Sequence, residues 1–254
     1  MKVNISIKDK SYSVDLKKGL DISIPLENGS NQVNCFWAPL FEISPVRTEH
    51  FVGSTLEGGL VNFKNVRINP HGNGTHTECI GHISKEVFNI NKVLKEFHHI
   101  AELITVIPQK LENGDRVITA ETIKPILEEI DDHKALIIRT SPNSLDKKQQ
   151  VYSGTNPCYI SKEAMEHIVD KGIEHLLVDL PSLDREEDGG KLAAHNTFWN
   201  YFGSLEGSRT NCTVTELIYV PDAIKDGTYF LNLQIASFEM DASPSKPVLY
   251  PLED

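Results

Sequence analysis

The sequence predicts a mixed α/β domain, and three features of the chain lead to this prediction. Apolar and polar residues alternate with a period of two at the N-terminus, as in paired β-strands. Two later segments, 119–130 and 161–172, begin at residues that can cap a helix. Each is followed by a short apolar run that fits a buried strand, and helices alternating with such strands are typical of α/β domains.

The N-terminal part is expected to contain strands followed by a covering loop. Residues 1–18 predict a β-hairpin, because apolar positions alternate on both sides of "KDK". These apolar positions are Val3, Ile5, Ile7, Tyr12, Val14 and Leu16. After "DISIPL", residues 27–60 are rich in Pro, Gly and aromatic residues, which indicates an ordered loop that covers another part of the domain.

The middle of the chain predicts two helix–strand pairs. Thr119 can cap a helix whose apolar stripe has the spacing i, i+3, i+4, i+7, with Pro125 in its first two turns. The stripe consists of Ile123, Ile126, Leu127 and Ile130, and "ALIIRT" follows as a buried strand. Ser161 can cap a second helix that ends at Gly172, and "HLLVDLPS" follows as another buried strand.

Length and charge limit the classes of function. A chain of 254 residues can form one sizeable core, so residues 1–254 are expected to form a single domain. A net charge of −11 and a pI near 5.4 argue against nucleic acid as a partner. The chain has no signal-peptide pattern and no apolar run of membrane-spanning length, so we expect no membrane partner and a cytoplasmic location. Its four cysteines form no CxxC pair and are expected to be reduced and buried.

The segment "INPHGNGTHTECIGHIS", residues 68–84, concentrates histidines around two glycines. Gly72 and Gly74 favour a turn, after which residues 76–82 are expected to be extended, with alternate side chains on one face. The side chains expected on that face are His76, Glu78, Ile80 and His82. His71 can fold back toward the same face, and two or more imidazoles with a carboxylate are typical of a divalent metal site.

Other motifs fit this part of the chain less well. The "GNG" segment lacks the third glycine of a dinucleotide-binding loop, and the chain has neither a GxSxG elbow nor a phosphate loop. Cys79 is expected to face away from His76, which favours a structural thiol over a nucleophile. The histidines outside the segment that are expected to be structural or at the surface are His98, His99, His133, His167 and His175.

The histidine segment resembles the cyclase or kynurenine formamidase-like family of metal-dependent hydrolases, whose hallmark is His-x-Gly-Thr-His-x-Asp-x-Pro-x-His. Later segments are similar to the family as well, namely "DLPSLD" at 179–184, "AAHN" at 193–196, "TVTELIYV" and "MDASPSKPVL" at 240–249. The resemblance covers roughly residues 20–250. It implies mixed β-sheets flanked by helices, of the swivelling β/β/α kind, and a homodimer or homotetramer.

The resemblance also implies a set of metal ligands. His71, His76 and Glu78 match the ligands of a first ion, and Glu78 is in place to bridge to a second ion. The residues implied for the second ion are His82, His195 and Glu216. The chain departs from the family in four ways: four residues instead of three separate the first two histidines, Glu78 replaces aspartate, Ile80 replaces proline, and the gap from His195 to Glu216 is longer than the family pattern implies.

These features predict a hydrolase. Imidazole and carboxylate ligands favour Zn²⁺ or Mn²⁺, with one or two ions per chain, and such an ion activates water for attack on a carbonyl. The expected reaction is cleavage of an amide-type C–N bond in a small molecule, such as a formamide, an aryl amide or a cyclic amide. His195 and Glu78 are the expected catalytic residues, and Trp37, Phe41 and Ser182 the expected substrate contacts.

Two other functions remain open at this stage. The additional turn residue and Glu78 fit a family member that has lost catalysis and binds a small ligand or a metal. A structural or interaction protein is the third possibility, but it leaves the histidine cluster without an explanation.

Overall fold

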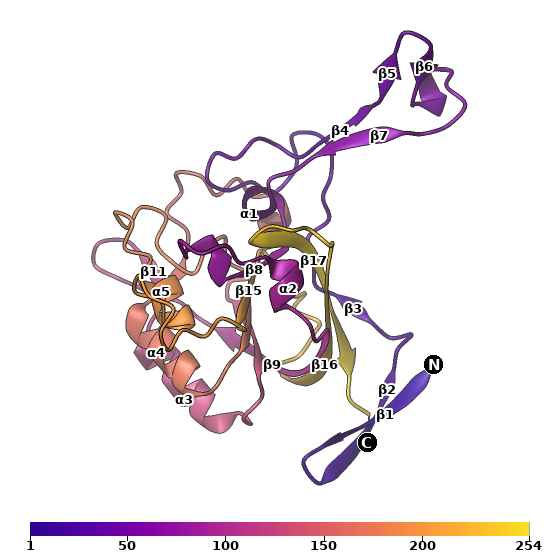
Figure 1. Ribbon diagram of the computed structural model, residues 1–254. Coiled ribbons are helices and arrows are strands. Elements are labelled where there is room, and N and C mark those ends of the chain that lie inside the picture. Colours follow the sequence, from indigo (N-terminus) through magenta and orange to yellow (C-terminus); the bar gives the residue numbers. More distant parts are fainter. Residues whose placement is uncertain (254) are drawn as a thin grey trace.

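A closed, barrel-like sheet of seven strands lies at the centre of the computed structural model, which describes residues 1–253 (Figure 1). In spatial order the strands are β16 (Gly227–Ile235), β9 (His98–Val106), β12 (Ala135–Thr140), β14 (His175–Val178), β15 (Thr213–Glu216), β8 (His76–Cys79) and β17 (Ala242–Pro251). Pairing of β16 with β17 closes the ring, and the short β3 (Leu20–Asp21) extends it at β17. Strands β9, β12, β14 and β15 are parallel, and the remaining pairs are antiparallel, so the predicted mixed α/β fold is confirmed.

The two faces of the sheet are both buried, which is why its central strands are apolar throughout. All six residues of β12 and all four of β14 are buried. Ala135 and Ile137 belong to the cluster inside the barrel, whereas Leu136 and Ile138 belong to the cluster that packs against the helices. The alternation of side chains along a strand therefore divides one apolar run between two cores.

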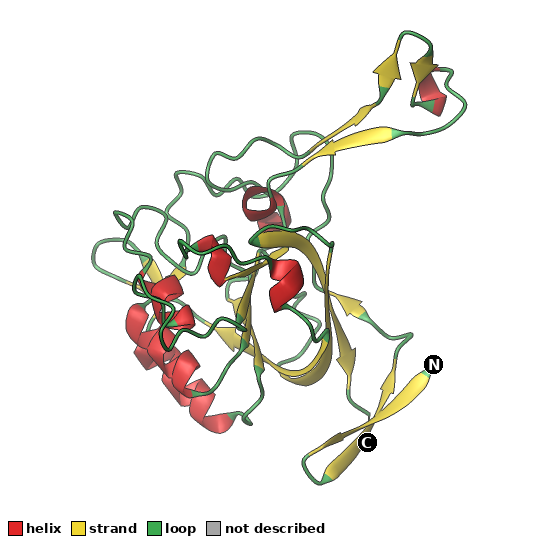
Figure 2. Cartoon of the chain, in the orientation of Figure 1, coloured by secondary structure: helices red, strands yellow, loops and turns green. Residues whose placement is uncertain are grey.

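Three helices cover one side of the barrel, as Figure 2 shows. They are α3 (Ala120–Glu129), α4 (Lys162–Asp170) and α5 (Ala193–Trp199). The first two confirm the sequence prediction: Thr122 Oγ1 accepts a hydrogen bond from the Thr119 N–H at 3.0 Å, and Ser161 Oγ accepts one from the Ala164 N–H at 3.2 Å. Helix α5 has no such capping signal in the sequence, because the residue before it is Leu192, whose side chain cannot accept a hydrogen bond. Leu192 adopts a left-handed backbone conformation.

The remaining elements are short and lie around the barrel. They are α2 (Ile90–Val93), β10 (Gln109–Lys110), β11 (Arg116–Ile118), η3 (Leu145–Lys148) and β13 (Tyr159–Ile160). At the N-terminus, β1 (Lys2–Ile7) and β2 (Lys10–Asp15) pair in the register Val3↔Val14, which confirms the predicted hairpin. None of the helices within residues 1–253 combines the length and the apolar composition that crossing a membrane requires. The four cysteines are free and buried, as expected.

The segment 27–60 differs from the expected covering loop. Residues 42–67 form an arm that projects from the barrel (Figure 1). Its stem pairs β4 (Glu42–Pro45) with β7 (Lys64–Arg67), and its tip contains β5 (Arg47–Thr48), β6 (Phe51–Val52) and the 3₁₀ turn η1 (Thr55–Glu57). Only the residues before the arm lie on the body, where the Gln32 side chain bonds both backbone groups of Phe41. Strands β4 and β7 are separated by 18 residues in the sequence, and their pairing leaves no local sequence pattern. The arm could therefore not be predicted.

The tip of the arm exposes large apolar side chains. Leu56 and Leu60 are 96% and 95% exposed. Such residues are typical of surfaces that contact another molecule. The homodimer or homotetramer implied by the family resemblance stays a prediction, which light scattering on the purified protein tests directly.

A pair of buried histidines at the start of β9 and β14 predicts a pH-dependent stability. The rings of His99 and His175 lie 4.0 Å apart between centroids, and His175 Nδ1 contacts Thr213 Oγ1 at 2.9 Å. Burial lowers the pKa of His175 to about 3. Because the unfolded chain binds a proton at this residue near pH 6.5 and the folded chain does not, stability is complete above that pH and falls below it.

We expect the wild-type protein to lose about 1 kcal/mol more unfolding free energy than His175→Gln between about pH 7.5 and 5.5. Glutamine keeps a polar group near Thr213 but does not titrate. Chemical denaturation at the two pH values measures the difference. Equal losses in the two proteins would contradict a neutral, buried His175.

Candidate metal centre

His71 lies on α1 (Pro70–Asn73), a single turn of helix. The Asn69 side chain accepts a hydrogen bond from the Gly72 N–H at 3.2 Å, and Pro70 occupies the first helical position, where no N–H is needed. The prediction that the glycines prevent a helix here is thus wrong, because the Asn69 cap and Pro70 stabilise one helical turn. A helical turn is compact along the chain, so it accommodates the additional residue between His71 and His76.

Strand β8 places His76 and Glu78 on one face, as predicted. The predicted extended conformation ends at Cys79, because η2 (Ile80–His82) forms a 3₁₀ turn. Gly81 permits that turn: a Cβ there would lie 2.4 Å from the Phe88 carbonyl oxygen. The turn sends Ile80 into the core beneath the helices instead of toward the cluster, yet it returns His82 to the side of Glu78.

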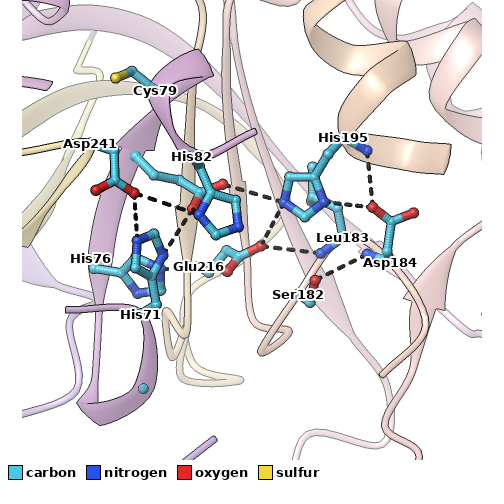
Figure 3. Close-up of polar contacts among 12 residues, drawn as sticks. His71, His76, Cys79, His82, Ser182, Leu183, Asp184, His195, Glu216 and Asp241 are labelled. Carbon is cyan, nitrogen blue, oxygen red and sulfur yellow. Dashed lines mark hydrogen bonds and ion pairs between the residues drawn. The ribbon is translucent and has the colours of Figure 1, made fainter. Parts of the chain in front are cut away.

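All six predicted ligands come together in one cluster (Figure 3). Its shortest contacts to Glu78 are His71 Nδ1 to Oε2 at 3.1 Å and His195 Nε2 to Oε1 at 3.3 Å. Glu216 approaches from β15, the register partner of β8, with Oε2 3.5 Å from His76 Nε2 and Oε1 3.7 Å from His195 Nε2. Helix α5 supplies His195 from a part of the sequence more than a hundred residues away.

Three histidines each have one ring nitrogen that faces away from the cluster, called the outer nitrogen here, in contact with an oxygen atom. The other ring nitrogen, called the inner nitrogen, faces the cluster. The contacts are His71 Nε2 to Asp241 Oδ2 (2.8 Å), His76 Nδ1 to the Gly74 carbonyl oxygen (2.9 Å) and His195 Nδ1 to Asp184 Oδ2 (2.6 Å). An oxygen acceptor on one nitrogen places the proton there and leaves the other nitrogen as a ligand atom. The inner nitrogens of all three rings face Glu78 or Glu216.

Several of these inner atoms are buried polar atoms without a hydrogen-bond partner within residues 1–253. They are His76 Nε2, His195 Nε2 and both carboxylate oxygens of Glu78. Each such atom costs roughly 1–3 kcal/mol when it stays unsatisfied. A divalent cation satisfies such atoms at once, and three overlapping groups have ligand atoms within 4.8 Å of one another. These groups are His71–His76–Glu78, His71–His82–Asp241 and Glu78–His82–His195. The residues present therefore fit a divalent metal.

The charges in the cluster are strongly coupled. Burial alone would raise the pKa of Glu78, but His82, His195 and His71 lower it well below its usual range. Burial lowers the pKa of His195, yet Asp184, Glu216 and Glu78 raise it well above the ordinary value. Because the raised pKa of His195 favours its protonated form, a cation bound at His195 Nε2 would displace a proton from that nitrogen.

Asp184 and Asp241 were not predicted as parts of the site. Both lie in segments that carried the family resemblance, "DLPSLD" and "MDASPSKPVL". Asp184 also accepts the backbone N–H groups of Ala194 and His195, which fixes the start of α5. The order of the motifs pointed to these segments, but no spacing rule connects an aspartate with a histidine so distant in the sequence.

The three predicted substrate contacts have different surroundings. Phe41 is 6% exposed and packs in the body, so its ring offers little surface to a ligand. Trp37 is 67% exposed, and its backbone N–H donates to Ser153 Oγ at 2.8 Å. Ser182 precedes Leu183, whose backbone N–H donates to Glu216 Oε1 at 3.1 Å, and Ser182 Oγ accepts from the Asp184 N–H at 3.2 Å (Figure 3).

Cys79 is a structural thiol, as predicted. It is fully buried, and burial raises the pKa of its thiol to about 12. Its Sγ lies 3.7 Å from the Phe88 carbonyl oxygen. The thiol is therefore protonated at neutral pH, and it packs in the apolar cluster inside the barrel instead of facing the histidines.

Comparison with models of protein families identifies the family of the chain. A family model described as "Putative cyclase" matches residues 20–185, well over half of the chain. The chain belongs to the putative cyclase family. This match confirms the resemblance found in the sequence. The part of this cyclase-family chain that matches contains His71, His76, Glu78 and His82, and it ends just after Asp184.

Solved structures agree with the fold of this cyclase-family chain. A predicted metal-dependent hydrolase from Bacillus stearothermophilus has 15% identity and a TM-score of 0.61, covering 92% of this chain and 98% of that one. An isatin hydrolase bound to the product analogue thioisatinate has 17% identity and a TM-score of 0.62, covering 92% of each chain. Isatin hydrolase A from Ralstonia solanacearum has 14% identity and a TM-score of 0.63, covering 93% of this chain and 92% of that one. No curated protein matches the chain. At these identities the likeness establishes the fold alone.

Proposed function

We propose that this protein is a metal-dependent hydrolase that cleaves an amide-type C–N bond in a small molecule. The observation that carries the proposal is the set of buried atoms of His76, Glu78 and His195 that have no hydrogen-bond partner within the described residues and belong to two compact groups sharing Glu78. A structural or interaction protein has no use for such a set, because each unsatisfied atom destabilises the fold.

The contacts favour a division of the ligands between two positions. His71 Nδ1, His76 Nε2 and Glu78 would hold a first ion, because these three residues form one of the compact groups. Glu78, His195 and Glu216 surround the second position, with His195 Nε2 within 3.3 Å of Glu78 and 3.7 Å of Glu216. Nitrogen and oxygen ligands without thiolate favour Zn²⁺ or Mn²⁺.

His82 is better placed than His195 to transfer a proton. His195 is 1% exposed, and Asp184 occupies its outer nitrogen. The His82 side chain is 32% exposed, and its Nδ1 approaches the carboxylates of Glu78 and Asp241 only to 3.7 and 3.5 Å. We therefore assign His195 to metal binding and His82 to proton transfer, and Glu78 would serve as a ligand at both positions.

The chemistry of amide hydrolysis matches these roles. A bound divalent ion would polarise the scissile carbonyl and lower the pKa of water, which makes hydroxide available near neutral pH. Hydrolysis places the oxygen of water on the carbonyl carbon and requires a proton on the leaving nitrogen. His82, at the solvent edge of the cluster, would deliver that proton.

Cyclic and aryl amides are the substrate class that we propose first. Two of the structurally similar proteins are isatin hydrolases by name, and the fold of this chain matches theirs over nearly its whole length. Trp37 has an exposed ring in the loop that packs on α1, where the Cys35 N–H donates to the Gly72 carbonyl oxygen at 3.0 Å. An exposed indole suits contact with a flat, aromatic substrate.

The experiment that tests the proposal is an activity screen of the protein loaded with Zn²⁺ or Mn²⁺. The panel contains formamides, aryl amides and cyclic amides, with the chelator-treated protein as the control. Release of carboxylic acid that depends on the ion is the expected result. A protein that binds either ion tightly but cleaves no member of the panel would favour the alternative, a family member that binds a metal or ligand without catalysis.

A further inference from the structure

We propose that Asp241 is a positioning residue of the metal centre: its carboxylate holds the His71 ring in the orientation that turns Nδ1 toward Glu78. The inference rests on the proposed function, because it concerns the affinity of the same site for its ion. Asp241 lies just before β17, far from the histidine segment in the sequence, and Figure 3 shows its carboxylate next to the His71 ring. The distance between His71 Nε2 and Asp241 Oδ2 is 2.8 Å.

The backbone fixes the position of this carboxylate. The Cys79 N–H donates to the Asp241 carbonyl oxygen at 3.0 Å, and the next residue, Ala242, is the register partner of Glu78. Gly81 leaves room for the side chain, because a Cβ there would lie 3.2 Å from the Asp241 Cβ. The Asp241 backbone is therefore anchored directly to the strand that carries Glu78, which keeps the carboxylate near the His71 ring.

His71 depends on its outer contact more than the other inner histidines do. His76 and His195 are almost completely buried, so packing already restricts their rings. The His71 side chain is 23% exposed and stands on a helix of only four residues. An acceptor at Nε2 keeps the proton on that nitrogen and the lone pair of Nδ1 available for a cation.

The same carboxylate oxygen also faces His82. Asp241 Oδ2 lies 3.5 Å from His82 Nδ1, and the rings of His71 and His82 are 4.4 Å apart between centroids. One oxygen thus bonds the exposed metal ligand and lies near the residue assigned to proton transfer. Loss of Asp241 would free the His71 ring, while the buried ligands would stay in place.

The test measures the affinity of the purified protein for Zn²⁺ or Mn²⁺ by competition with a chromophoric chelator. We expect Asp241→Ala to weaken binding by about 10- to 100-fold, the usual effect of losing a residue that orients a metal ligand. Asp241→Asn should keep affinity within about tenfold of the wild type, because its amide oxygen can accept the hydrogen bond from His71 Nε2–H. Thermal unfolding of the metal-free variants shows that each is folded.

Glu239→Ala is the matched control. Glu239 lies two residues before Asp241, but its carboxylate contacts Asn89 and Asn91 at the surface instead of the histidines. Affinity equal to the wild type is expected for this variant. Wild-type affinity in Asp241→Ala, or equal losses in Asp241→Ala and Asp241→Asn, would overturn the positioning role. A wild-type protein that binds neither ion would instead contradict the proposed function itself.

Discussion

Replacing His76 by alanine is expected to abolish both metal binding and hydrolysis. His76 is completely buried, its Nδ1 is held by the Gly74 carbonyl oxygen, and its Nε2 points at the centre without a partner among the described residues. Its imidazole therefore has the geometry of a ligand with a fixed tautomer. Removal of such a ligand should weaken metal affinity by more than the roughly 10- to 100-fold that loss of a supporting residue causes.

The measurement is the metal content and the amide-cleaving rate of the variant beside the wild type. His50→Ala is the control, because His50 is an exposed histidine on the arm, where its closest charged neighbour is Glu49 at 3.9 Å. Far-ultraviolet circular dichroism checks that the His76→Ala protein is folded. A folded His76→Ala protein with normal metal content and rate would remove His76 from the site.

Shortening Glu78 to aspartate is expected to lower activity, although aspartate is the usual residue of the family motif. The glutamate oxygens reach His71 Nδ1 at 3.1 Å on one side and His195 Nε2 at 3.3 Å on the other. Shortening the side chain by one methylene would break these contacts. The two histidines cannot follow the carboxylate, because Asp241 holds His71 and Asp184 holds His195. We expect metal affinity to fall by about tenfold or more.

The same substitution separates the two functions proposed for the family member. If Glu78 compensates for the additional residue in the turn before His76, Glu78→Asp reduces the rate and the metal affinity together. If Glu78 and the additional turn residue mark a site that has lost catalysis, Glu78→Asp together with deletion of one residue between His71 and His76 restores activity. Glu78→Gln keeps the length of the side chain and removes its charge. Comparing it with Glu78→Asp separates the effect of side-chain length from the effect of charge. An increase in rate with Glu78→Asp would contradict the ligand geometry described above.

The elements that could be predicted are those with local signals. The N-terminal hairpin, α3, α4 and the buried strands β12 and β14 follow from alternation, caps and short apolar runs. The arm at 42–67 and helix α5 could not be predicted, since distant pairing and packing stabilise them. The 3₁₀ turn at 80–82 was missed because it depends on the contact of Gly81 with the Phe88 backbone.

The candidate site divides in the same way. The motif segment and the family resemblance found every inner residue, including the distant His195 and Glu216, because those side chains carry recognisable chemistry. Asp184 and Asp241, which contact the outer nitrogens of His195 and His71, were not predicted. An aspartate that orients a distant histidine leaves no recognisable pattern in the sequence. Phe41 was expected to contact the substrate, and the fold shows that its side chain is 6% exposed.

The most direct measurement is the metal content of the wild-type protein, by elemental mass spectrometry, after purification without a chelator or a histidine tag. The expected result is about one or two equivalents of zinc or manganese per chain, since Glu78 is placed between two sets of ligands. Absence of bound metal, even after each ion has been added back, would show that the converging imidazoles and carboxylates do not form a metal centre. The hydrolase proposed here would then be contradicted.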